Sequence, residues 1–341
     1  MLQKLKFHFI KITRFEFWPY GLLYIPVYFY YLYLSLKAGS ITFFTAANPG
    51  FYIGGFVGVS KKNILDKINK QYLPATLYFK AGDNLDKVKK EISLHQISFP
   101  LIVKPDVGER GKYVEKADDE KSLKEYLSKN DFDFIIQELV AEGIELGILY
   151  YHFPDGSKSG ITSVVIKEFL NVRGDGKNTL RTLIGKNMRA QGRLDYLFNK
   201  FHQKLDHILE KDKTLILEPI GNHVRGTKFL SGNYLINDKL VKVFDEIGKK
   251  INGFYIGRFD LKVRSIPDLY EGKNIRIMEL NGVSSEPAHI YDPSTYIINA
   301  YRALFLHYKL VYIIAMQNKK KGIQFVPFRV VWKELKRHFQ K

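Results

Sequence analysis

The sequence predicts an α+β protein of two or three domains, in which helices alternate irregularly with strands paired as hairpins. Three observations support this class. The chain has 341 residues, more than a single hydrophobic core usually serves. Hydrophobic residues make up 45% and charged residues 26%, which is typical of a folded globular protein and excludes disordered and fibrous classes. Most apolar runs are short and separated by turns, which disfavours a regular parallel βαβ series.

Each expected element follows from hydrophobic periodicity or from a turn signal. Up to residue 145 we expect helices at 18–37, 60–71, 83–94 and 118–129, strands at 41–44, 74–79, 100–104 and 134–139, and turns at 48–58 and 106–111. Beyond it we expect strands near 147–153 and 161–169, a turn at 173–176, a helical basic stretch at 178–210, mixed elements at 214–300, a helix at 300–316 and a basic tail. These elements divide the chain into units 1–80, 81–145, 146–300 and 301–341.

Charge and cysteine content limit the classes of function. The 53 Lys and Arg residues exceed the 35 Asp and Glu residues, and the net charge of +18 predicts an anionic partner or substrate. The lack of cysteine excludes disulfides, thiolate nucleophiles and cysteine-ligated metals. Because no helix-turn-helix, zinc-finger or RNA-recognition motif accompanies the basic residues, we expect no nucleic-acid partner.

Two segments in the first half of the chain carry candidate nucleotide-binding residues. A buried strand ends in Lys104, a point charge for an anionic ligand, and the next turn contains Gly108 and Gly111, whose backbone N–H groups can approach phosphate oxygens. The apolar strand that ends at 137–140 offers backbone groups for an adenine edge, and Glu145 follows at a spacing suited to ribose hydroxyls. Taken alone, each is also typical of a solvated strand end or an ordinary turn.

The second half of the chain contains a stronger pattern. One strand carries Arg258 and Asp260 on one face, and the next strand carries Glu279 and Asn281 on one face. Three oxygen donors beside an arginine suit Mg²⁺, and they are costly to bury in apolar strands without a cation. An earlier loop adds Arg225, a positive fork suited to phosphate, although a plain surface loop is the alternative there.

Together and in this order, the motifs resemble the ATP-grasp superfamily over residues 60–292. Gly257–Asp260 is similar to the Gly-Arg-x-Asp of D-alanine–D-alanine ligase, and the turn at 173–180 with the loop at 222–227 is similar to cyanophycin synthetase and the glutamate ligases. The resemblance implies an ATP-grasp fold, with two α+β subdomains at 81–145 and 146–300 that clamp ATP. A reduced N-terminal α/β unit bearing an aromatic helix would precede them.

The resemblance also implies an activity and a set of site residues. The activity is ATP-dependent ligation of a carboxylate to an amine or another nucleophile through an acyl phosphate, with ATP and Mg²⁺ or Mn²⁺. The metal ligands would be Asp260, Glu279 and Asn281. ATP would be bound by Lys104, Gly108, Gly111, Gln137, Glu138, Leu139, Val140, Glu145, Lys167, Asn222 and Arg225. The catalytic residues would be Lys104 and Arg225 on the phosphates and Arg258 on the acyl phosphate.

The acceptor side is less defined by the sequence. The segment 283–289 is expected to line the acceptor site, and His289 is a candidate base for the amine proton, with a structural role as the alternative. The chain departs from the family pattern at Glu109 and Arg110, where small residues are usual, and in its short N-terminal unit. A kinase acting on a small-molecule or lipid-head-group hydroxyl and a non-catalytic nucleotide-binding protein at a membrane surface remain alternatives. The substrates and the oligomeric state stay open, a homodimer included.

The two ends of the chain are basic and flank apolar segments. Residues 1–16 carry a net charge of +3 and residues 317–341 carry +7, while residues 17–36 contain six tyrosines and no charge. Such a segment predicts a helix that lies on a membrane, is buried by the protein, or spans the bilayer. A span would export the basic first residues of an ATP-using protein, against the positive-inside rule. We therefore expect a cytoplasmic protein, peripheral on the anionic inner face of the membrane.

Overall fold

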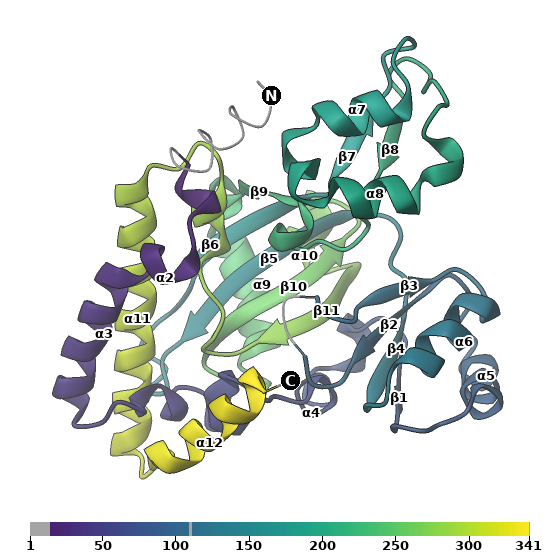
Figure 1. Ribbon diagram of the computed structural model, residues 1–341. Helices are drawn as coiled ribbons and strands as arrows, with labels where there is room; N and C mark the ends of the chain where they lie inside the picture. The colour runs from purple at the N-terminus through teal and green to yellow at the C-terminus, as the bar shows by residue number, and fades with distance from the viewer. Residues whose placement is uncertain (1–13, 109–110, 341) are drawn as a thin grey trace.

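The structure, a computed structural model, describes residues 14–108 and 111–340 and has the α+β architecture expected from the sequence (Figure 1). Its two main parts are antiparallel sheets of four and five strands. A small lobe with a two-stranded sheet and a group of N- and C-terminal helices flank the larger sheet. These two sheets give the two-subdomain arrangement that the sequence resemblance implies.

The four-stranded sheet forms the smaller part, with the strand order β1-β4-β2-β3. Its strands are β1 (Thr76–Phe79), β2 (Leu101–Pro105), β3 (Glu115–Ala117) and β4 (Phe134–Glu138). Helices α5 (Leu85–Leu94) and α6 (Glu120–Lys129) share its core, and the side chains of Asn84 and Asp119 cap their N-termini. Strand β1 belongs to this sheet because it pairs with β4, although the sequence places it before residue 80 in the N-terminal unit.

The five-stranded sheet forms the larger part, with the strand order β11-β10-β5-β6-β9. Its strands are β5 (Ile144–His152), β6 (Ser159–Glu168), β9 (Lys228–Ser231), β10 (Ile256–Val263) and β11 (Ile275–Asn281). Helices α9 (Asp238–Gly248) and α10 (Ile266–Glu271) share a core with one face through residues such as Phe259 and Leu261. Because side chains alternate along a strand, Arg258 and Asp260 project from the opposite face.

The small lobe lies between β6 and β9 in the chain and has its own apolar core. Its elements are β7 (Asn171–Arg173), β8 (Thr214–Ile216), α7 (Leu180–Lys186), η5 (Met188–Arg193), α8 (Leu194–Lys200) and η6 (His202–Lys204). The expected helical stretch at 178–210 is therefore interrupted. Asn187 ends α7 with an extended backbone, and its side chain caps the following 3₁₀ turn.

Helices from both ends of the chain lie on one side of the larger sheet (Figure 1), and α3 packs against α11 there. They are α2 (Tyr20–Leu23), α3 (Ile25–Ala38), α11 (Ile297–Lys320) and α12 (Phe328–Phe339). The expected helix at 18–37 is divided at Tyr24, because Pro26 starts a new helix in its first turn. Leu34 of α3 is buried with Ile314 of α11, whereas Phe29 and Leu36 on the other side of α3 are exposed. Within residues 14–108 and 111–340, no helix combines the length and the apolar character needed to cross a bilayer.

One further expectation about the ends of the chain is wrong, and one helix there was not predicted. The expected strand at 41–44 is a 3₁₀ turn, η2 (Phe43–Ala46), because Phe43 and Ala46 are buried in contact with α11 instead of pairing with a strand. The basic tail contains α12, whose Val331 is buried. The expected helix at 60–71 is shorter. The remaining short elements are η1 (Phe15–Phe17), η3 (Tyr52–Gly55), α4 (Lys61–Leu65), η4 (Lys70–Tyr72), η7 (His223–Arg225), η8 (Asn233–Leu235) and η9 (Ala288–Tyr291).

Candidate active site

The register of two strands gathers polar residues on one face of the larger sheet. In the antiparallel pair β10–β11, Arg258 is opposite Asn281 and Asp260 is opposite Glu279. Directly opposite residues of such a pair project from the same face. The three expected metal ligands and the expected acyl-phosphate arginine therefore lie side by side. The other face of these strands is apolar, so the face with the charges is the one available for chemistry.

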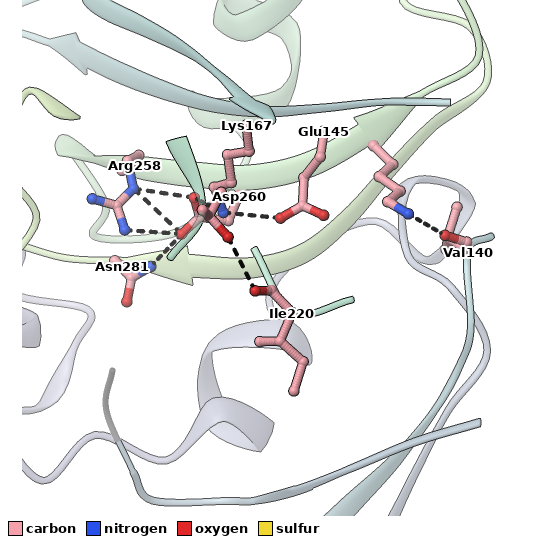
Figure 2. A network of polar contacts seen from close by, with 9 residues as sticks. Val140, Glu145, Lys167, Ile220, Arg258, Asp260 and Asn281 are labelled. Atoms are coloured by element: carbon pink, nitrogen blue, oxygen red, sulfur yellow. Dashed lines mark hydrogen bonds and ion pairs between the residues drawn. The ribbon is translucent and has the colours of Figure 1, made fainter. Parts of the chain in front are cut away.

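Asp260 is the centre of a buried network of charges (Figure 2). Its carboxylate accepts hydrogen bonds from Arg258 Nε at 3.1 Å and Nη2 at 3.0 Å, and from Asn281 Nδ2 at 2.9 Å. Lys167 Nζ lies 3.1 Å from its other side. Burial raises the pKa of Asp260, but Arg258 and then Lys167 more than offset this, so the pKa falls to about 2. The carboxylate is ionised across the physiological range.

Glu145 and Lys167 extend this network across β5 and β6. Lys167 Nζ lies 3.1 Å from Glu145 Oε1, and both side chains are buried. Burial lowers the pKa of Lys167, but Asp260 and Glu145 raise it above its ordinary value, so the amine stays charged. A Cβ on Gly221 would lie only 2.2 Å from Glu145 Oε1. A glycine is therefore required where the 221–227 loop meets the expected ribose-binding acid.

Lys104 connects the two sheets. It lies on β2, and its Nζ donates to Gln137 Oε1 of β4 at 3.0 Å and to the carbonyl oxygen of Met278 of β11 at 3.0 Å. Burial is the largest influence on its amine and lowers its pKa to about 8, although Glu279 acts in the opposite direction. The structure thus joins two motifs that were predicted separately and aims a lysine from the small sheet at the polar face of the large one.

The end of the expected adenine-binding strand contacts Lys262, a residue for which no role was predicted from the sequence. Lys262 Nζ donates to the Val140 carbonyl oxygen at 2.6 Å. Lys262 follows Arg258 and Asp260 at alternate positions of β10, and this period of two is the signal that would have identified it. Glu138 is exposed and accepts a hydrogen bond from the Ala75 backbone. Leu139 follows directly after β4 and is half-buried.

The 221–227 loop contacts the glycine turn of the small part. Arg225 Nη2 donates to the Gly111 carbonyl oxygen at 2.6 Å, and the Asn222 side chain accepts from the Val224 N–H at 2.8 Å. On the other side of the turn, Lys61 Nζ donates to the Gly108 carbonyl oxygen at 2.7 Å. Residues 109 and 110 of this turn lie outside the described residues. The expected phosphate-binding loop and the expected phosphate-binding arginine are thus in direct contact.

His289 lies in a setting that does not suit the expected base. Its Nδ1 is 2.8 Å from Ser163 Oγ, and burial lowers its pKa to about 4. The ring is therefore neutral at pH 7 and a weak proton acceptor. This geometry favours the structural alternative for His289.

The donor set on β10 and β11 fits a hard divalent cation. It consists of the carboxylates of Asp260 and Glu279 and the amide oxygen of Asn281, the ligand type that Mg²⁺ prefers. Asp260 is already neutralised by Arg258 and Lys167, whereas Glu279 has no ion pair with any described Lys, Arg or His. Over the described part of the chain, no three His, Cys, Asp or Glu side chains cluster as a metal site.

The charged network does not coincide with a hollow beside α4 on the described surface. That hollow, of about 380 Å³, is formed by residues of 50–52 and 59–67 around α4, and none of the charged side chains of the network lines it. It has no cluster of opposed charges comparable to that around Asp260. We therefore locate the candidate site by its side chains.

Comparisons with known proteins give similarity at the level of the fold. No family model matches the chain, and no curated protein does. Similar solved structures include a bifunctional glutathione synthetase from Pasteurella multocida, at 15% identity over 72% of this chain and 35% of that one, with a TM-score of 0.37. VanG D-Ala:D-Ser ligase from Enterococcus faecalis is 14% identical over 75% of this chain and 60% of that one, with a TM-score of 0.43. D-alanine–D-alanine ligase from Bacillus anthracis is 15% identical over 76% of this chain and 67% of that one, with a TM-score of 0.41.

All three are ATP-grasp enzymes, the class that the sequence resembles. The chain spans about a third of the glutathione synthetase and three fifths of the D-Ala:D-Ser ligase. At these identities and TM-scores, the similarities assign no activity or residue role to this chain.

Proposed function

We propose that the chain is an ATP-dependent ligase that joins a carboxylate to an amine or another nucleophile through an acyl phosphate. One observation carries the proposal: Lys104, Lys167 and Arg258 converge from both sheets around Asp260 and Glu279. Phosphoryl transfer needs mainly positioning and charge neutralisation, and this group of side chains supplies both. The network is buried, where such charges are worth more than in water.

In the first step, a carboxylate oxygen of the substrate attacks the γ-phosphorus of ATP, and the bond to ADP breaks. We place the phosphates against Lys104, Lys167 and Arg225, and the developing acyl phosphate against Arg258. Asp260, Glu279 and Asn281 would hold Mg²⁺, or Mn²⁺ in its place, which neutralises charge on the phosphate oxygens when bound.

The nucleotide base and ribose belong at the end of the small sheet in this proposal. Adenine would pair with the backbone of 137–140, and Glu145 would accept from the ribose. Asn222, together with the backbone of Gly108 and Gly111, would complete the phosphate end. The contact between Arg225 and the Gly111 carbonyl oxygen supports this arrangement, because it brings the two phosphate-binding segments together.

A hydroxylamine trap tests the first step without knowledge of the acceptor. Wild-type protein is incubated with Mg·ATP, hydroxylamine and a panel of amino acids and dicarboxylates, and hydroxamate and ADP are measured. A ligase forms hydroxamate with at least one carboxylate, and none after removal of metal by EDTA. A kinase instead yields a stable phosphorylated hydroxyl compound, and nucleotide binding without any turnover would identify a non-catalytic protein.

We further propose that the protein acts at the cytoplasmic, anionic surface of a membrane. Phe29 and Leu36 of α3 are 70% and 83% exposed, and Trp332 and Phe339 of α12 are 49% and 82% exposed. Lys319, at the end of α11, contacts the end of α3, so these helices meet. The exposed basic residues of α12 are Arg329, Lys333, Lys336 and Arg337. Apolar and cationic side chains on the same helices match a bilayer with anionic lipid.

A further inference from the structure

Glu286 lies in the segment that follows β11 and is held by two tyrosines. The Tyr291 hydroxyl donates to its Oε1 at 2.8 Å, and the Tyr24 hydroxyl donates to its Oε2. Tyr24 is contributed by the junction of α2 and α3, 262 residues earlier in the chain. The aromatic N-terminal helices therefore extend to the end of the polar face and orient this carboxylate.

Within residues 14–108 and 111–340, the carboxylate of Glu286 is bonded to hydroxyls and to no cation. Among the described residues, no Lys, Arg or His forms an ion pair with it, although it is half-buried and bonded to two tyrosine hydroxyls. The ring of Tyr20 stacks on that of Tyr24, with centroids 3.9 Å apart. A half-buried carboxylate that is held by neutral hydroxyl donors, with no counter-charge among the described residues, is a favourable environment for a cation.

Glu286 is also close to the arginine of the reaction centre. A tight turn, in which the Ser285 N–H donates to the Gly282 carbonyl oxygen at 3.0 Å, directs the chain back immediately after Asn281. Burial lowers the pKa of Arg258, but Asp260 and, more weakly, Glu286 and Glu279 raise it above its ordinary value. The guanidinium donates its hydrogen bonds to Asp260, whereas the hydrogen-bond partners of Glu286 among the described residues are the two tyrosine hydroxyls.

We infer that Glu286, oriented by Tyr24 and Tyr291, binds the ammonium group of a primary-amine acceptor next to Arg258. This inference rests on the proposed ligase function and narrows its second substrate to amines. It also replaces the expected role of His289, whose ring is bonded to Ser163. A neutral hydroxyl or thiol acceptor would leave the charge of Glu286 without a partner.

The second step then proceeds with Glu286 as a positioning and binding group. The amine nitrogen attacks the acyl carbon, the C–N bond forms, and the C–O bond to phosphate breaks with its electron pair leaving on the phosphate. The ammonium loses two protons in all: one ends on the departing phosphate and the other passes to solvent. Atoms and charges balance without a further reactant.

The test separates the two steps with acceptors of different charge. Hydroxylamine is neutral at pH 7 and reports formation of the acyl phosphate. The acceptor is identified with a panel that consists of primary amines, from methylamine to 1,4-diaminobutane, and the twenty amino acids. We expect Glu286→Gln to keep hydroxamate formation within about twofold of wild type but to raise KM for the accepted amine at least about tenfold. Tyr24→Phe and Tyr291→Phe, which remove only hydroxyls, should raise the same KM less. Glu271→Gln, an equal charge change on α10, is the matched control.

Each outcome decides the matter. If wild type and Glu286→Gln have the same KM for the amine, the inference is overturned. It is also overturned if wild type forms hydroxamate but uses no amine of the panel as an acceptor and is competitively inhibited by none of them. A wild type that forms no hydroxamate with any carboxylate refutes the proposed ligase function itself, and the inference with it. Thermal unfolding of each variant shows whether a loss of activity is caused by a loss of the folded state.

Discussion

Glu279 and Asp260 occupy one row of β10 and β11 but differ in the partners that they hold. Asp260 is bonded to Arg258, Lys167 and Asn281, whereas Glu279 has no ion pair among the described residues. We therefore expect Glu279→Gln to abolish Mg-dependent ADP release with little change in melting temperature. Asp260→Asn should abolish it as well and also destabilise the fold by about 3–5 kcal/mol, because two buried cations lose their counter-charge.

Enzyme assays and thermal unfolding of the two variants check this prediction. Full turnover of Glu279→Gln would contradict its metal-binding role. Equal melting temperatures of the two variants would contradict the assignment of Asp260 as the centre of the buried network.

Lys104 predicts a pH dependence of ATP use. Its pKa is lowered to about 8 by burial, so the amine loses its proton as the pH rises through 8, well before an ordinary lysine does. Since only the charged form attracts phosphate, kcat/KM for ATP should fall as the pH is raised from 7 to 9. Arg keeps its charge at these pH values, so Lys104→Arg should remove this part of the decline. A wild-type profile that is flat to pH 9.5 would contradict the assignment.

At the scale of residues, the sequence predicts the donors but not their partners. Arg258, Asp260, Glu279 and Asn281 follow from strand periodicity, and the register brings them together. Glu286 has no such signal, because its role depends on Tyr24, which is distant in sequence. A contact across 262 residues leaves no local pattern, so sequence reasoning could assign only the whole segment to the acceptor.

At the scale of elements, the contact between the 221–227 loop and the glycine turn predicts a coupled effect. Arg225 donates to the carbonyl oxygens of Gly111 at 2.6 Å and Val114 at 3.3 Å. Replacement by Ala removes both bonds as well as the charge. We expect Arg225→Ala to raise KM for ATP and to speed amide hydrogen exchange in residues 111–114, whereas Arg225→Lys should retain part of the ATP affinity. Unchanged exchange in Arg225→Ala would show that this contact does not order the turn.

Elements with clear apolar periodicity were predicted well, and those defined by tertiary contacts were not. The strands of both sheets follow from short apolar runs, as β2 and β4 illustrate. The turn η2 was mistaken for a strand because its phenylalanines pack on α11, a contact that the local sequence does not contain. The helix α12 was missed because the high charge of the tail obscured its apolar positions.

At the scale of the whole molecule, the described N- and C-terminal helices provide the most exposed apolar surface. Of α3, Tyr28, Leu32 and Tyr33 are also about half exposed, with values of 47%, 48% and 52%. Of α12, Phe328 and Trp332 stack at 6.0 Å and form one exposed stripe. Helix α3 packs against α11, whose C-terminal turn carries Lys319 and Lys320, and α12 follows α11 in the chain. Tyr24, which orients Glu286, stands at the start of α3, one of the helices that would contact lipid, so an amine acceptor is expected to approach from the membrane side.

Liposome flotation tests this arrangement. Each Lys or Arg near an anionic surface contributes about 1 kcal/mol, and each Phe side chain transferred from water contributes about 1.5–3 kcal/mol. We expect binding to anionic vesicles at low salt, little binding to neutral vesicles, and release at about 1 M salt, where the screening length falls to about 3 Å. Replacing Phe328, Trp332 and Phe339 with Ser should weaken binding strongly. The same number of changes at exposed apolar residues elsewhere, Tyr196→Ser, Ile208→Ser and Tyr234→Ser, should leave it unchanged. Equal binding by the two triple variants, or none by wild type under any condition, would contradict the membrane role and leave the positive charge to the anionic substrates.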